Sequence, residues 1–146
     1  MMIYKTNDQV ELMRQSGLLV SKTLTEIAGT LKPGITTLSI DRKVGEFIKD
    51  HQAIPSFLNY NGYPFNSCIS VNDVVVHGFP GPKELVEGDI ITIDIGVILN
   101  GWHGDHAYTC ILGDADPAAI QLVKITKESL YKGSEKAIVN NRIGDI

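Results

Sequence analysis

The sequence predicts an α+β fold in which two helices come first, antiparallel strands follow and a third helix comes last. Two observations carry this prediction. Apolar residues recur at helical spacing before residue 52 and again after residue 116. Between residues 90 and 112 they alternate with polar residues around an Asn-Gly pair, a strong signal for a hairpin. A chain of 146 residues without repeats has the length of one domain.

Three helices are expected. The first is capped by Asn7 or Asp8 and runs to about residue 30, where the sequence "KPG" stops it. The second is capped by Thr37 and runs to about His51. The third begins at the Asp-Pro pair after residue 115, is amphipathic and runs to about Val139.

The strands are expected in the middle of the chain. The segment "AIPSFLNYNGYPFNSC", residues 53–68, is rich in Pro, Asn and Gly and indicates an ordered loop. The segments "CISV" and "VVVHG" around Asn72 and Asp73 indicate a short hairpin. A longer hairpin follows, in which the strand "IITIDIGVI" turns at Asn100 and Gly101 into a second strand that ends near Leu112.

Composition excludes several classes of partner. Apolar residues make up 43% and charged residues 21% of the chain, as in an ordinary globular protein. The net charge of -4 and the pI of about 5.5 provide no basic surface for nucleic acid or an anionic membrane. No apolar run reaches membrane-spanning length, and the first residues lack a signal-peptide pattern. We therefore expect a cytoplasmic protein with no nucleic-acid or membrane partner.

The two cysteines, Cys68 and Cys110, lack the Cys-x-x-Cys spacing of a zinc knuckle or a thioredoxin motif. In a reducing compartment we expect both to be free thiols. Nothing near Cys68 in the sequence would lower the pKa of its thiol, so it indicates a buried thiol or pocket wall rather than a nucleophile.

The longer hairpin brings two acids together. Strand side chains alternate, so Asp94 and Gly96 lie on the face opposite the isoleucines. If the Asn-Gly turn is a two-residue loop, Asp105 lies opposite Gly96, and the Cβ atoms of the two aspartates are at most roughly 7–8 Å apart. Gly96 would leave space for a cation. A three-residue loop without a bulge would instead place the acids on opposite faces.

The hairpin alone leaves two interpretations of these acids open. Antiparallel sheets commonly expose one face to water, so both acids could simply be solvated. Adjacent like charges, however, are unfavourable unless a cation or a proton compensates them, which favours a metal site. Two metal ions bridged by a carboxylate lie about 3.5–4 Å apart, and this hairpin could hold them.

Three histidines also need an interpretation. His77 ends a run of valines before Gly and Pro, where a loop presents functional groups, although it could equally be a packed or surface histidine. His103 shares the face of the aspartates, but His-Gly-Asp is too short a motif to trust. His106 points to the apolar face and is expected to be structural.

Aromatic residues cluster in the loop before the strands. They indicate either a small core under an irregular loop or an apolar substrate pocket. The members of this cluster are Phe57, Tyr60, Tyr63 and Phe65.

These motifs carry a family resemblance. The segments "GYPFNSCISVNDVVVHGFP" and "LVEGDIITIDIGVILNGWHGDHAYT" resemble the N-terminal half of type I methionine aminopeptidases, of the creatinase or pita-bread metallohydrolase superfamily. The opening "MRQSGLLVSKTLTEIAGTLKPGITTLSID" is similar to the family's first two helices, and the match runs from about residue 5 to the last residue. The resemblance implies the N-terminal half of a pita-bread fold, with antiparallel hairpins packed against helices.

The resemblance also implies roles for single residues. Asp94 resembles the bidentate ligand of one metal ion, and Asp105 resembles the aspartate that bridges both ions. His77 resembles the catalytic histidine that contacts the substrate amide and helps to stabilise the tetrahedral intermediate without being an essential ligand. His103 and Gly104 match a family variant in which the histidine does not bind metal.

Four residues resemble the walls of the family's methionine side-chain pocket. These substrate-binding residues are Tyr60, Tyr63, Cys68 and Phe57, the last at a position where some relatives have a cysteine.

The activity implied by the resemblance is metal-dependent removal of the N-terminal methionine from nascent polypeptides. Two divalent ions, drawn from Co, Mn, Fe or Zn, would activate a water molecule and polarise the scissile carbonyl. The expected partner is the N-terminus of a new polypeptide near the ribosome, and the full-length protein is expected to be a monomer.

The chain lacks some of the metal ligands of the family pattern. The family's remaining ligands, one histidine and two glutamates, lie in a second half of the fold. No histidine follows His106, while Glu128 and Glu135 lie in the expected third helix and match none of those motifs. We therefore expect residues 1–146 to be a single truncated methionine aminopeptidase-like catalytic domain with half a metal site, inactive alone.

Two other functions stay open. The chain could belong to another pita-bread hydrolase, such as an X-Pro dipeptidase or aminopeptidase P. It could also be a non-catalytic binding module on the same fold. In either case a missing second half would leave strand edges and apolar surface uncovered.

Overall fold

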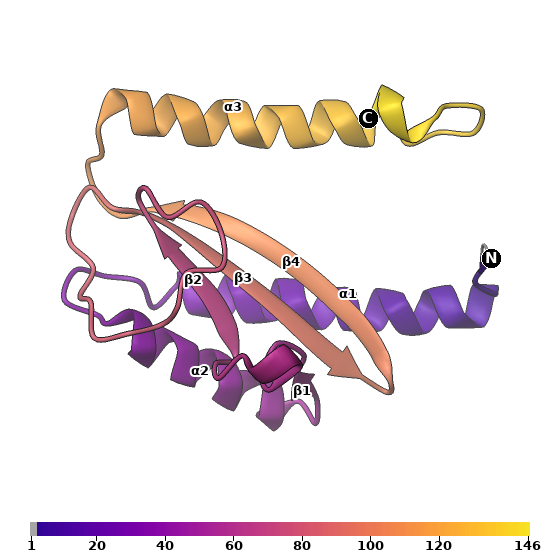
Figure 1. Ribbon diagram of the computed structural model, residues 1–146, viewed down its shortest axis with the longest axis horizontal. Coiled ribbons are helices and arrows are strands. Elements are labelled where there is room, and N and C mark those ends of the chain that lie inside the picture. The colour runs from indigo at the N-terminus through magenta and orange to yellow at the C-terminus, as the bar shows by residue number, and fades with distance from the viewer. Residues whose placement is uncertain (1–2) are drawn as a thin grey trace.

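The computed structural model describes residues 3–146 and confirms the α+β prediction. Figure 1 shows α1 and α2 beside one sheet and α3 apart from them. In chain order the elements are α1 (Asn7–Ala28), α2 (Thr37–Asp50), β1 (Ile54–Pro55), the 3-10 helix η1 (Tyr60–Gly62), β2 (Ser67–Val71), β3 (Ile90–Leu99), β4 (Trp102–Ile111), α3 (Pro117–Ser134) and the 3-10 helix η2 (Ile143–Asp145).

Strand β3 is the centre of the sheet. It pairs with β4 on one side and with β2 and the short β1 on the other, and every pairing is antiparallel. Its odd-numbered residues from Ile91 to Val97 are at most 1% exposed. They form one core with the apolar residues of α1 and α2, where each buried side chain contributes about 1.5–3 kcal/mol. The even-numbered face of β3, which includes Asp94, is left free for a site.

The β3–β4 hairpin has the predicted register. Asn100 and Gly101 both adopt positive φ angles, of 53° and 80°, as the predicted two-residue turn requires. Leu99 pairs with Trp102, and the pairing continues without a bulge to Ile90 and Ile111. The parity of every side chain on the hairpin is therefore as predicted.

The predicted cap of the first helix was wrong. Thr6, rather than Asn7 or Asp8, caps α1. Its hydroxyl accepts a hydrogen bond from the backbone N–H of Gln9, and the Gln9 side chain accepts one from the backbone N–H of Thr6. This reciprocal capping box satisfies two backbone donors at once, which a single Asn or Asp cap does not.

The other two helices differ from expectation at one end each. Thr36 caps α2, one residue before the predicted Thr37, because its hydroxyl reaches the backbone N–H of Ser39. Asp116 caps α3 as predicted, but the helix ends at Ser134 rather than near Val139. A glycine in its last turn has low helix propensity, and turns follow it.

The predicted short hairpin was also wrong. Its first half is β2, but residues 74–77 form no strand, and Val75 is 85% exposed. Asn72, with a φ of 56°, instead turns its side chain to the start of β3. Its amide nitrogen donates to Asp89 at 2.8 Å, and its amide oxygen accepts from the backbone N–H of Ile90 at 3.0 Å. These hydrogen bonds shape residues 72–77 into a loop that passes over the sheet.

Helix α3 stands apart from the sheet along one side of the molecule (Figure 1). It has no buried residue, and apolar side chains such as Leu130 are 45–65% exposed. Lys127 approaches the sheet, with its ammonium 5.6 Å from the ring centroid of Tyr108. Within residues 3–146, no helix combines the length and the apolar character that crossing a membrane would require.

Candidate active site

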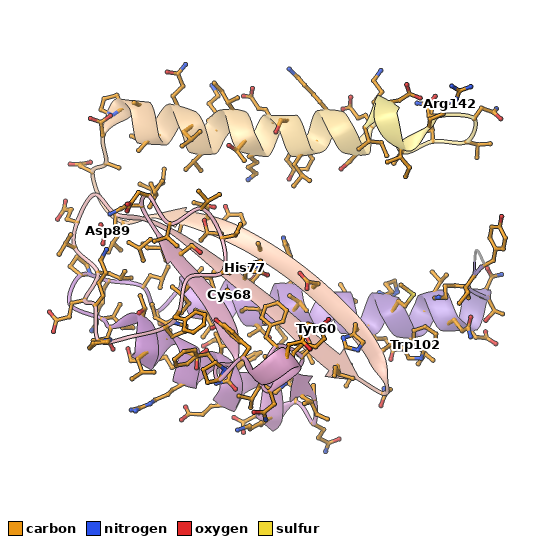
Figure 2. The ribbon with its side chains drawn as sticks, in the orientation of Figure 1. Tyr60, Cys68, His77, Asp89, Trp102 and Arg142 are labelled. Carbon is orange, nitrogen blue, oxygen red and sulfur yellow. The ribbon has the colours of Figure 1, made fainter. Side chains whose placement is uncertain are left out.

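A cavity of about 570 Å³ lies on the face of the sheet away from α1. Figure 2 shows Tyr60, Cys68 and His77, which come from η1, β2 and the loop after β2, around the same part of the sheet. The cavity brings together every site residue predicted from the sequence: Phe57, Tyr60, Tyr63, Cys68, His77, Asp94 and Asp105.

The two aspartates enter this cavity from neighbouring strands. Asp105 on β4 lies opposite Gly96, and Asp94 on β3 lies opposite Ala107, as the hairpin pattern predicted. Both carboxylates therefore lie on one face as diagonal neighbours. Asp94 is not a fully solvated acid, because its Oδ1 is buried.

Asp94 is electrostatically unfavourable in this position. Burial raises the pKa of its carboxyl above the usual value, and the charge of Asp105 raises it further, while His77 and His106 lower it. Its Oδ1 atom has no hydrogen-bond partner. A buried carboxylate oxygen without a donor is rare, and a cation is one of the few groups that compensate it.

The two carboxylates fit part of a metal site. Oxygen ligands of this kind suit hard and borderline divalent cations, and the unpartnered Oδ1 of Asp94 points to such a ligand. Over residues 3–146, however, no group of three or more His, Cys, Asp or Glu side chains is placed to hold one ion. Asp94 and Asp105 therefore fit as members of a larger ligand set.

The space over Gly96 was predicted for a cation, and that prediction was wrong. A Cβ at Gly96 would collide with the hydroxyl of Ser56 and would lie 2.6 Å from a ring carbon of Phe57. The absent side chain thus lets residues 56 and 57 pack onto the sheet and close one side of the cavity.

His77 lies in the loop after β2 rather than at the end of a strand. Its φ of 57° is uncommon for a residue with a side chain. The next residue holds it there: the backbone N–H of Gly78 donates to Ser70 Oγ at 3.1 Å, and the Gly78 carbonyl accepts from Ile69 N–H at 2.8 Å. A Cβ at Gly78 would collide with the carbonyl of Ile69, so this close approach requires glycine.

The apolar wall is built from residues 57–63, which include η1, and from β2. The Tyr63 hydroxyl donates to the carbonyl of Ser67 at 2.9 Å, and burial raises the pKa of that phenol. Cys68 is 7% exposed and pairs with Asp94 across β2 and β3. Burial also raises the pKa of the Cys68 thiol, so a wall role suits it better than that of a nucleophile. Both Cys68 and Cys110 are free, as predicted.

Comparison with known proteins decides the family. The sequence model of metallopeptidase family M24 matches residues 11–146, which is nearly the whole chain. The chain belongs to this family. Membership confirms the resemblance read from the motifs and implies dependence on a divalent metal ion.

The chain is similar to bacterial members of family M24 along its whole length. It is 48% identical to a methionine aminopeptidase of Clostridium perfringens and 46% identical to one of Clostridium acetobutylicum. Both alignments cover 100% of the chain and 59% of the relative. The crystal structure of methionine aminopeptidase from Rickettsia prowazekii matches 91% of the chain and 54% of its own, with a TM-score of 0.89 and 40% identity. The chain thus spans about 59% of the length of its curated relatives.

Three wall residues of this cavity were missed in the sequence: Asn61, Gly62 and Phe79. Asn61 and Gly62 have the φ angles of a tight turn, 48° and 82°, and in the sequence they indicated only a loop. The Phe79 ring packs edge-on against Tyr63, with centroids 5.1 Å apart. The sequence "GFPG" after His77 was the available signal, because it places an aromatic residue on the same loop.

Other candidates lie outside this cavity. His103 shares the face of the aspartates by register, but it does not line the cavity. His106 faces α1, where its Nδ1 lies 3.4 Å from Ser21 Oγ. Glu128 lies on the exposed surface of α3, 4.0 Å from Lys124. These positions agree with their exclusion from the candidate ligands.

Proposed function

We propose that this chain contributes the substrate pocket and two metal ligands to a methionyl aminopeptidase, which removes the N-terminal methionine from new polypeptides. The observation that carries the proposal is the unpartnered, buried Oδ1 of Asp94, which lies beside Asp105 in an aromatic pocket. The relatives named methionine aminopeptidase, at 46–48% identity, support the same substrate.

Asp94 and Asp105 are proposed to hold two divalent ions, with Co, Mn, Fe and Zn as candidates. When bound, such ions supply Lewis-acid polarisation of the scissile carbonyl and a water molecule of lowered pKa. Because the described residues offer two acids rather than a full set, we propose that further ligands come from the part of the relatives' length that this chain does not span.

His77 is the proposed catalytic residue. Its loop lies at the cavity and is fixed to β2 through Gly78, so the backbone that carries its ring is held in place before substrate arrives. A ring N–H donated to the oxygen of the scissile amide would stabilise the negative charge that develops there.

The pocket is proposed to select methionine. Its walls include four aromatic rings and the Cys68 thiol, and its volume is of the size that binds small ligands. Phe57, Tyr60 and Tyr63 would contact the thioether chain, and Phe57 is held against Gly96. A branched side chain would meet these rings, so an unbranched one is preferred.

The setting is part of the proposal. We place residues 1–146 in one catalytic domain that acts in the cytoplasm near the ribosome, where new N-termini emerge and where free thiols such as Cys68 persist. The full-length protein is proposed to be a monomer that needs no nucleic acid or membrane.

Hydrolysis of a Met-Ala-Ser peptide with Mn²⁺ or Co²⁺ tests the proposal, with released methionine measured by mass spectrometry. The complete protein that contains this sequence should release methionine, and Asp94→Asn should reduce the rate at least about a hundredfold. Wild-type rates in that variant would end the ligand assignment. Faster cleavage of an X-Pro peptide would select a proline-specific hydrolase instead, and peptide binding without cleavage would select a binding module.

A further inference from the structure

Asp41 on α2 is a buried carboxylate, only 3% exposed. In the part of the chain that the structure describes, no lysine, arginine or histidine forms an ion pair with it. A buried charge without a cation is tolerated only where hydrogen-bond donors surround it. Donors from neighbouring segments must therefore compensate Asp41.

All of these donors come from the residues that begin β2. Asp41 Oδ1 accepts hydrogen bonds from the backbone N–H of Asn66 at 2.9 Å, and from the backbone N–H and the hydroxyl of Ser67, both at 2.8 Å. Oδ2 accepts from Asn66 Nδ2 at 2.9 Å. Each hydrogen bond to a charged group contributes about 1.5–3 kcal/mol, so this carboxylate fixes the start of β2 onto α2.

The fixed segment carries part of the cavity wall. The carbonyl of Ser67 accepts the hydrogen bond of the Tyr63 hydroxyl, at 2.9 Å. The next residue, Cys68, lines the cavity opposite Asp94. A shift of Ser67 would therefore move the Tyr63 hydroxyl and the Cys68 thiol together, although Asp41 itself does not line the cavity.

The surroundings of Asn66 make the role of Asp41 testable. Gly45 of α2 provides the room for this amide, since a Cβ there would lie 2.7 Å from Asn66 Cγ. The amide oxygen of Asn66 is buried and has no hydrogen-bond partner. If Asp41 became asparagine, its side-chain oxygen could still accept the three hydrogen bonds from the backbone N–H of Asn66 and from Ser67, which would keep the segment in place. The Asn66 amide would give up its 3.3 Å hydrogen bond to the Asp41 carbonyl in order to turn over and accept from the new N–H group.

We propose that Asp41 is a positioning residue that sets the affinity of the cavity for an unbranched apolar side chain, by fixing Ser67 and with it Tyr63 and Cys68. The inference rests on the proposed function for its ligand class. Its geometric part, that Asp41 holds the wall, does not depend on that function.

The test uses the 146-residue chain as wild type, Asp41→Ala and Asp41→Asn. The rates at which the two thiols react with a disulfide reagent are resolved by mass spectrometry, and Cys110 serves as the internal control. In Asp41→Ala we expect Cys68 to react at least about tenfold faster relative to Cys110, and L-methioninamide, followed by NMR, to bind at least about tenfold more weakly. In Asp41→Asn both values should stay within about twofold of wild type.

An unchanged thiol ratio and unchanged affinity in folded Asp41→Ala would overturn the proposal. An equal rise in the reaction rates of both thiols would also overturn it, because it would show that the whole fold has loosened. If Asp41→Ala does not fold, the double variant Asn66→Ala with Ser67→Ala replaces it, because it removes both side-chain donors to Asp41 and keeps the carboxylate. The ratio should rise there, and a wild-type ratio overturns the proposal. If the wild-type chain does not bind methioninamide, the proposed ligand class fails, while the thiol ratio still decides the role of Asp41.

Discussion

Asp94 and Asp105 are diagonal neighbours on one face of the β3–β4 hairpin, and the charge of Asp105 adds to the burial that raises the pKa of Asp94. The two neighbouring negative charges are therefore unfavourable in the absence of a cation. The unpartnered Oδ1 of Asp94 is a second unfavourable feature. Functional sites often contain groups of this kind, which lower the stability of the fold.

The first prediction is that Asp94→Asn stabilises the metal-free chain. The folded-state pKa of Asp94 is raised, so its ionised form opposes folding at neutral pH, and this cost disappears as the pH falls through that pKa toward the unfolded value. The variant should be more stable by up to about 1 kcal/mol at pH 7, and the difference should shrink at pH 4. Urea unfolding with EDTA at both pH values measures this, with exposed Glu128→Gln as control. A variant less stable than wild type at pH 7 would contradict the argument.

The second prediction separates two glycines at one contact. A Cβ at Gly104 would lie 2.6 Å from the backbone carbonyl of Ser16, so Gly104→Ala should push α1 off the sheet and cost about 1–3 kcal/mol. Gly17, the next residue of α1, has open space around its Cβ position, so Gly17→Ala should stabilise the helix by about 0.5–1 kcal/mol. Thermal unfolding of both variants checks the opposite signs. Equal effects would mean that the close approach of Ser16 to residue 104 does not limit the side chain there.

The third prediction concerns metal binding. Two carboxylates without a third clustered ligand should bind Mn²⁺ weakly in the 146-residue chain, with a Kd on the order of 0.1–1 mM. Broadening of NMR signals by Mn²⁺ should center on Asp94, Asp105 and nearby His77, and should vanish in Asp94→Asn. Stoichiometric binding at micromolar concentration, measured by calorimetry, would show that this chain already holds a full ligand set.

The site could be predicted from sequence where local rules determine it. The Asn-Gly turn fixes the register of the longer hairpin, and strand alternation then fixes the face of Asp94 and Asp105. The roles of Tyr60, Tyr63 and Cys68 needed the family motifs, because no local rule places residues of η1 and β2 at one cavity.

The rest depended on long-range contacts. The run of valines after Asn72 predicted a strand. In the structure the Asn72 amide instead donates to Asp89 and accepts from the backbone N–H of Ile90, and the valines form a loop. Likewise, the space over Gly96 was empty only in the isolated hairpin, and Ser56 with Phe57 fills it in the fold. Neither contact has a signature within a few residues of the chain.

The last prediction separates His77 from His103, two histidines that the sequence alone presents as similar candidates. His77 lines the cavity and His103 does not, although His103 shares the face of the aspartates on the hairpin. His77→Asn should lower kcat for a Met-Ala-Ser peptide about 10²–10³-fold, because the shorter asparagine amide does not place an N–H where the ring N–H is proposed to meet the developing oxyanion. Asparagine tolerates the φ of 57° at this position, so the backbone should stay in place. His103→Asn should change kcat less than about twofold, and Mn²⁺ affinity should stay unchanged in both variants. Steady-state kinetics of the complete protein give the comparison: equal losses in the two variants would remove His77 from its proposed role.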